Sequence, residues 1–195
     1  MRRSPQHVHG LLFGLAVFLL APCALPAAAQ EDDSAAGPEG VGAEVLQTIA
    51  VAEQKFIGLA EALSEEQYAW RPGEGVRSVS EVFMHIAGNN YWLPILLGYP
   101  APDGVPITRD YQSAWDYEKN TGRAEVRAAL QASFTHLKET LAQVPPDRLD
   151  EPMDIFGTPG TVRAYLLVIT THMHEHLGQA IAYARMNGVK PPWSN

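Results

Sequence analysis

The sequence predicts an all-α protein, a four-helix bundle preceded by a signal peptide (residues 1–29) and a short disordered tether (residues 30–42). In four segments of residues 43–195, apolar side chains recur at the three- and four-residue spacing of an amphipathic helix. Prolines and glycines separate these segments, and no convincing strand is visible between them. About 166 residues would follow the signal peptide, enough for one domain with a proper core.

The first thirty residues have the three parts of a secretory signal peptide. Met1-Arg2-Arg3 provides the positive start, Gly10–Ala21 is an apolar run of twelve, and Ala27-Ala28-Ala29 provides small residues for cleavage before Gln30. Twelve apolar residues are too few to span a bilayer. An uncleaved anchor or a buried helix is the alternative. We expect a cleaved signal, and therefore a periplasmic or extracellular protein whose only link to the membrane is its export signal.

The only cysteine, Cys23, lies inside this leader. Leu20-Ala21-Pro22-Cys23 faintly resembles a lipoprotein cleavage box, but Pro22 departs from the small residue usual there, so lipidation is the minority alternative. Without residues 1–29 the chain would have no thiol, so its stability would come from packing.

Charge argues against nucleic acid as a partner. The chain has 14 Lys and Arg against 22 Asp and Glu, and removal of Arg2 and Arg3 with the leader would leave 12. Phosphate binding needs a basic stripe, and no basic run is present. A small-molecule ligand or substrate is the expected partner, and a homodimer remains open.

The first two helices follow the tether. The first has its apolar stripe over 45–63 and ends before the turn-rich segment 68–75. The second begins at a capping box, in which the Ser78 hydroxyl accepts from the backbone N–H of Glu81 and the Glu81 carboxylate accepts from that of Ser78. It ends near Gly98, with Pro94 in its last turn.

The connection from Tyr99 to Gly122 is too long to be structureless without a reason. We expect it to pack across one end of the bundle through its aromatic residues, Tyr111, Trp115 and Tyr117. The third helix is predicted over Arg123–Gln143, where Pro145-Pro146 stops it, and the fourth begins after Thr161 and runs to Asn187, with Gly188 as its C-terminal glycine.

Three of the five histidines that follow the leader lie in one short stretch of the fourth helix, His172-Met173-His174-Glu175-His176. His172 and His176 are four residues apart, so they leave the same helix face with Cβ atoms about 6 Å apart, within reach of one metal ion. They belong to the predicted core-facing stripe, which continues to Gln179, whereas His174 points to the other side.

A third ligand is needed for a convincing metal site, and His85 is the natural candidate. It lies on the core-facing side of the second helix, one turn before Asn89. Three neutral imidazoles with open positions are typical of a reactive metal centre rather than a closed structural one. Buried histidines that only satisfy the core remain an equal alternative at this point.

The same stretch also matches the H-x-x-E-H string of inverted zinc peptidases. Those enzymes take a carboxylate ligand from well downstream, and no Asp or Glu follows Glu175 in this chain. Peptidase chemistry is therefore disfavoured.

From about Val45 to Pro192 the chain resembles the DinB-like (DinB/YfiT) superfamily. The resemblance is carried by three groups of residues in this order: Trp70-Arg71-Pro72; Ser78-Val79-Ser80-Glu81-Val82 leading to His85; and His172, His176, Gly178 and Gln179, followed by Arg185, Gly188 and Pro191-Pro192.

The resemblance implies an up-down-down-up bundle in which His85, His172 and His176 bind a divalent ion, commonly zinc or nickel. It places neither His136 nor His174 at the metal. We expect His136 to be solvated and His174 to lie near the site or on the surface. Asn89 could hydrogen-bond a metal-bound water, and a packing or helix-exposed role is the equal alternative. Asn89 and Gln179 are the candidates for residues that support the ligands.

Two functions remain open from the sequence. Some relatives implied by the resemblance are thiol S-transferases and others act on thiol adducts, but an exported chain would not meet their cytosolic thiols. The first hypothesis is a metal-dependent enzyme of transferase or hydrolase type acting on a small molecule. The second is a non-catalytic, stress-related protein of the cell envelope that holds a metal or ligand. No carboxylate is visible on the stripe of His172, so no general base is assigned.

Overall fold

The structure is a computed structural model that describes residues 40–118 and 122–194. The signal peptide, Cys23 and nearly all of the tether lie outside the described residues. The first helix begins at Val41, two residues before the expected start of the domain.

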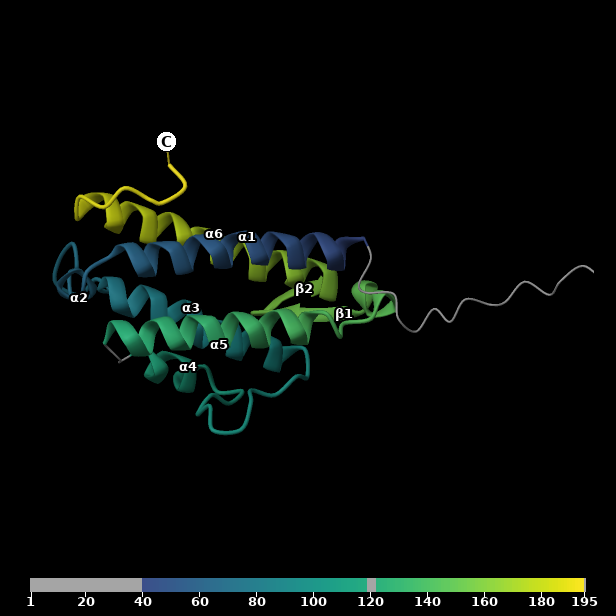
Figure 1. The fold of residues 1–195 in the computed structure, drawn as a ribbon. Coiled ribbons are helices and arrows are strands. Elements are labelled where there is room, and N and C mark those ends of the chain that lie inside the picture. Colours follow the sequence, from purple (N-terminus) through teal and green to yellow (C-terminus); the bar gives the residue numbers. More distant parts are fainter. Residues whose placement is uncertain (1–39, 119–121, 195) are drawn as a thin grey trace, which may run out of the picture. The chain divides into compact units, whose positions relative to one another are not determined.

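Four long helices form the bundle: α1 (Val41–Ala62), α3 (Val79–Leu96), α5 (Arg123–Leu141) and α6 (Val162–Met186). Helices α1 and α3 each pack against both α5 and α6, so α1 and α3 lie on a diagonal. Helices α1 and α6 run in one direction and α3 and α5 in the other (Figure 1). This is the up-down-down-up order that the resemblance implies. None of the helices in the described part of the chain is long and apolar enough to cross a membrane.

The predicted helix signals explain where these helices begin and end. Ser78 Oγ accepts from Glu81 N at 3.2 Å, and a Glu81 carboxylate oxygen accepts from Ser78 N at 2.7 Å, so the capping box that starts α3 is confirmed. Gly188 follows α6 with φ of 72°, the left-handed conformation typical of a helix-ending glycine. The core between the helices includes Phe56 and Phe134, whose ring centroids are 5.9 Å apart.

The connection between α3 and α5 is long because these two neighbours are parallel, and the chain must return along the bundle between them. Part of this crossover is helical: α4 (Tyr111–Tyr117) begins at Asp110, whose carboxylate accepts from Gln112 N at 3.0 Å. Helix α4 packs closely on α3 at Gly88, where an added Cβ would lie 3.1 Å from Ala114 O.

Tyr111 and Tyr117 of the crossover pack on the bundle as expected, but against the side of α3 and not across one end. Their rings contact Trp92 and Tyr91 of α3 at centroid distances of 4.7 and 6.2 Å. Trp115 is 47 % exposed instead, with the Arg77 guanidinium over its ring.

The expectation of no strand is wrong. Strands β1 (Pro152–Ile155) and β2 (Thr158–Thr161) form an antiparallel hairpin before α6, with Ile155 opposite Thr158. Proline and glycine, which strands rarely contain, occur in it, and each strand has only four residues, so no alternating pattern is visible in the sequence. Two further short elements complete the described fold, helix α2 (Glu65–Tyr68) and the 3-10 helix η2 (Pro146–Asp150).

Candidate metal centre

His85 of α3 and His172 and His176 of α6 come together between the two helices. One ring nitrogen from each lies within 4.8 Å of the others, and the Nε2 atoms of His85 and His172 are 3.1 Å apart. His85 is buried, whereas His172 and His176 are partly exposed. The structure thus brings together the three histidines that the sequence selected.

Two supporting side chains set which ring nitrogen of a histidine faces the cluster. Glu118 Oε1 lies 2.5 Å from His85 Nδ1, and Gln179 Oε1 lies 2.9 Å from His176 Nδ1. An ionised carboxylate and an amide oxygen only accept hydrogen bonds, so each Nδ1 is the protonated donor. Nε2 of His85 and of His176 is therefore the unprotonated nitrogen, the one that can bind a metal ion.

Glu118 is the functional residue that the sequence did not reveal. It ends α4, its side chain is only 8 % exposed, and Arg77 donates to it from Nε at 2.8 Å and from Nη2 at 3.3 Å. Burial alone would raise the pKa of this carboxyl group, but the hydrogen bonds from His85 and Arg77 outweigh burial and hold the pKa below its usual value. Glu118 is therefore ionised at neutral pH.

The two residues expected to support the ligands both lie beside the cluster. Gln179 contacts His176 and donates to the Tyr183 hydroxyl at 3.0 Å. Asn89 donates to the backbone oxygen of His85 at 2.8 Å, and its amide nitrogen lies 3.3 Å from His85 Nδ1. Asn89 is buried and contacts His85 directly, which fits a packing role, and its hydrogen bond to a metal-bound water stays a prediction.

The remaining two histidines lie apart from the cluster. His174 is exposed and its Nδ1 lies 2.8 Å from the backbone oxygen of Thr170, in agreement with a surface position. The expectation that His136 is solvated is wrong, because its ring packs 5.3 Å from that of Tyr91 and its Nε2 is buried. Burial lowers the pKa of His136.

The cluster has the protonation state that a divalent metal requires. Burial, followed by the neighbouring His176 and His85, lowers the pKa of His172 to about 3, and burial likewise lowers the pKa of His176. Both imidazoles are thus neutral at pH 7, the form that binds metals. Zn–N bonds of 2.0–2.1 Å place two nitrogens of a tetrahedral site about 3.3 Å apart, close to the observed 3.1 Å. The donor set therefore fits a divalent ion.

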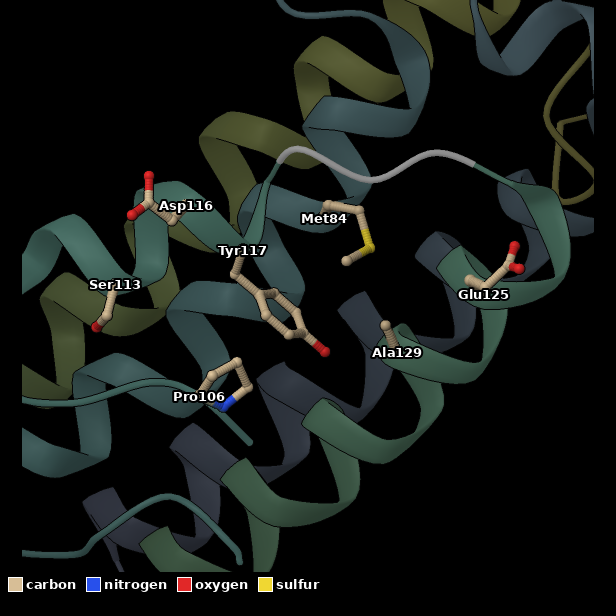
Figure 2. A pocket seen from close by; sticks show the side chains of 7 residues that line it. All are labelled: Met84, Pro106, Ser113, Asp116, Tyr117, Glu125 and Ala129. Atoms are coloured by element: carbon tan, nitrogen blue, oxygen red, sulfur yellow. The ribbon is translucent and has the colours of Figure 1, made fainter. Parts of the chain in front are cut away.

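Two hollows adjoin the cluster. One, of about 440 Å³, is lined by His172 and Asn89 and otherwise by apolar and aromatic side chains. The other, of about 450 Å³, is polar and includes Arg77, Glu118 and Gln179. A larger hollow of about 530 Å³ between α3, α4 and α5 contains no histidine, and Tyr117 extends across it (Figure 2). The chemistry is therefore expected at the two hollows beside the histidines.

Comparison with known proteins agrees with a helical bundle. The sequence profile of the DinB superfamily matches residues 48–180. The chain therefore belongs to the DinB superfamily. No functionally curated protein was found to match it.

Three solved structures have the same fold. The DinB-like protein YjoA from Bacillus subtilis is 21 % identical, with 75 % of this chain and 93 % of that one covered and a TM-score of 0.58. A DinB-like protein from Bacillus cereus is 19 % identical, with coverages of 77 % and 95 % and a TM-score of 0.60. YfiT from Bacillus subtilis, described as a probable metal-dependent hydrolase with an unusual four-helix bundle topology, is 17 % identical, with coverages of 76 % and 89 % and a TM-score of 0.61.

Proposed function

We propose that the protein binds a divalent metal ion through His85, His172 and His176 and is a metal-dependent enzyme, of hydrolase or transferase type, that acts on a small molecule. The observation that carries the proposal is the convergence of three imidazoles, two of which have Nδ1 engaged by an acceptor and Nε2 turned to the cluster. Imidazole ligands suit zinc and nickel equally well, so both are candidates.

Such an ion supplies Lewis acidity, which lowers the pKa of a water or thiol enough to make it a nucleophile at neutral pH. The protein's own residues hold the ligands and shape access. Glu118 keeps the His85 ring in the productive tautomer, Arg77 neutralises Glu118, and Gln179 orients His176. The hollow beside His172 has mostly apolar and aromatic walls, which would favour an apolar part of a ligand. The description of YfiT as a probable metal-dependent hydrolase supports the hydrolase alternative.

A non-catalytic protein that holds a metal or ligand is the second candidate. One observation favours it: Glu118, the carboxylate that contacts the cluster, is fully engaged by His85 and Arg77 and is poorly placed to serve as a general base. Turnover of model esters such as p-nitrophenyl acetate, compared between metal-loaded and metal-stripped protein, separates the two candidates.

The metal centre is tested by measuring metal per chain and the thermal midpoint for wild type and four single alanine variants. His85→Ala, His172→Ala and His176→Ala are expected to lose most of the bound metal. His174→Ala is the matched control, because this exposed neighbour lies outside the cluster and its Nδ1 is hydrogen-bonded to the backbone of its own helix. If the wild type binds no divalent ion under any loading condition, or if His174→Ala loses as much metal as His172→Ala, the proposal is wrong.

We also propose that the protein is exported to the periplasm or beyond and that its mature chain begins near Gln30. The proposal is supported by the basic start, the short apolar run and the alanine cleavage site of the leader. Mass spectrometry of the protein from its native host is expected to show this N-terminus. A lipid on Cys23 or an intact Met1 would contradict it.

A further inference from the structure

The tip of the β1–β2 hairpin carries an aromatic residue in an unfavourable backbone conformation. The turn has two residues, Phe156 with φ of 54° and Gly157 with φ of 86°, between the paired residues Ile155 and Thr158. Positive φ at both positions defines a type I′ turn, which favours Asn at the first position and Gly at the second. A bulky aromatic residue is strained there, and such strain concentrates at functional positions.

The Phe156 ring is not used to fill the core, because the residue is 58 % exposed. It stacks on Trp92 with a centroid distance of 6.0 Å and an interplanar angle of 10°. Trp92 in turn contacts the ring of Tyr111 at 4.7 Å, edge to face. The crossover and the hairpin, which α5 separates in the sequence, thus place two aromatic rings around Trp92 of α3.

These three rings form the walls of the 440 Å³ hollow that ends at His172. Its remaining lining residues are Asn89, Leu93 and Val168, so its polar groups are those of Asn89, His172 and the Tyr111 hydroxyl. The volume is in the range of cavities that bind small organic molecules. These aromatic walls favour a flat aromatic ligand, because aromatic rings pair favourably through offset-stacked and edge-to-face contacts.

The charges at the histidine end indicate the ligand's head group. Imidazole side chains bind a metal in their neutral form, so they would leave the charge of a divalent ion uncompensated, and Glu118 is already paired with Arg77. An anionic head would meet an unsatisfied positive charge at this end of the hollow.

We propose that this hollow is the substrate subsite and that it takes a small aromatic molecule with an anionic head, with Phe156 as a specificity-determining residue. The inference rests on the proposed metal centre, since the head is held at His172. Phe156 would contact the aromatic body and not the head, so its removal should weaken binding of aromatic ligands selectively.

The test uses the full zinc-loaded protein and two carboxylate probes, 2-naphthoate and acetate, with binding measured by calorimetry. Naphthoate is expected to bind at least tenfold more tightly than acetate. Phe156→Asn removes the aromatic ring, so it should weaken naphthoate binding at least tenfold and leave acetate affinity and zinc content unchanged. Because Asn is favoured at this turn position, the thermal midpoint should be unchanged or raised. Leu167→Asn is the matched control, because Leu167 is 52 % exposed on α6 and does not line the hollow.

Val168→Phe provides an independent variant that narrows the hollow from α6, and it should also weaken naphthoate without loss of zinc. Zinc content is measured first in each sample. A wild type without zinc overturns the proposed metal centre and this inference with it. If zinc binds but naphthoate is no tighter than acetate, or Phe156→Asn keeps the wild-type naphthoate affinity, only this inference is overturned. A clear fall in the midpoint of Phe156→Asn would show that the ring serves packing, and would also overturn the assignment.

Discussion

Replacing Glu118 by glutamine should weaken metal binding although Glu118 contacts no metal. Its carboxylate accepts a hydrogen bond of 2.5 Å from His85 Nδ1 in a nearly solvent-free position. That bond holds the ring in the tautomer whose Nε2 binds a metal, and its negative charge makes the imidazole a stronger donor. Glu118→Gln keeps the shape of the side chain and removes the charge.

The expected size follows from these contacts. Loss of such a supporting residue generally costs about 10–100-fold in metal affinity, or about 1.4–2.8 kcal/mol. Glutamine should lie near the tenfold end, because its amide oxygen can still accept from His85 Nδ1. Glu118→Ala should lie near the hundredfold end, and it should also lower stability, because it leaves the partly buried guanidinium of Arg77 without its carboxylate.

The dissociation constant for zinc is measured by competition with a chromophoric chelator. Glu175→Gln is the matched control, because it removes the same charge beside His176 from an exposed position that holds no ligand ring in place. If Glu118→Gln binds zinc within twofold of wild type, or no more weakly than Glu175→Gln, then the contact with His85 does not support the metal site and the reasoning fails.

Three further outcomes are expected. Gly88→Ala should weaken zinc binding several-fold with little change in thermal midpoint, because the new methyl group would push on Ala114 of α4 and shift Glu118; unchanged zinc affinity would contradict this. Urea unfolding of wild type should show stability falling as the pH drops from 7.5 to 5.5 more steeply than in His136→Gln, because burial lowers the pKa of His136 in the fold and the unfolded chain takes up the proton first; equal slopes would refute it. Phe134→Ala should cost about 3–5 kcal/mol by denaturant titration, and a loss below 1 kcal/mol would mean that the core is packed differently.

The long helices were predictable because their signals are local. Periodic apolar residues, the capping box at Ser78 and the glycine at position 188 act within a few residues of sequence, and α3 begins where the capping box indicates. The spacing of His172 and His176 was equally local, since a step of four residues on a helix fixes which side chains share a face. His85 needed the family resemblance in addition, because no local rule relates α3 to α6.

Glu118 and the hairpin were not predictable because they depend on contacts distant in sequence. The crossover contains four acids, Asp103, Asp110, Asp116 and Glu118, and no pattern distinguishes them. Glu118 is brought beside His85 by the close packing of α4 on α3, which the lack of a side chain at Gly88 permits. The hairpin is similarly held by tertiary packing, with both strands against α6, and not by strand-forming residues.

The metal ligands and the residues around them come from different parts of the fold. The ligands lie on α3 and α6, whose regular backbones keep the imidazoles fixed relative to one another, as a metal centre requires. The groups that tune and line the site come instead from the crossover, which supplies Glu118 and Tyr111, and from the hairpin, which supplies Phe156. Changes in these two segments can alter what reaches the metal without disturbing the bundle. Substitution of Phe156 and Tyr111 should therefore change ligand choice at constant metal affinity, whereas substitution of Glu118 should change metal affinity itself.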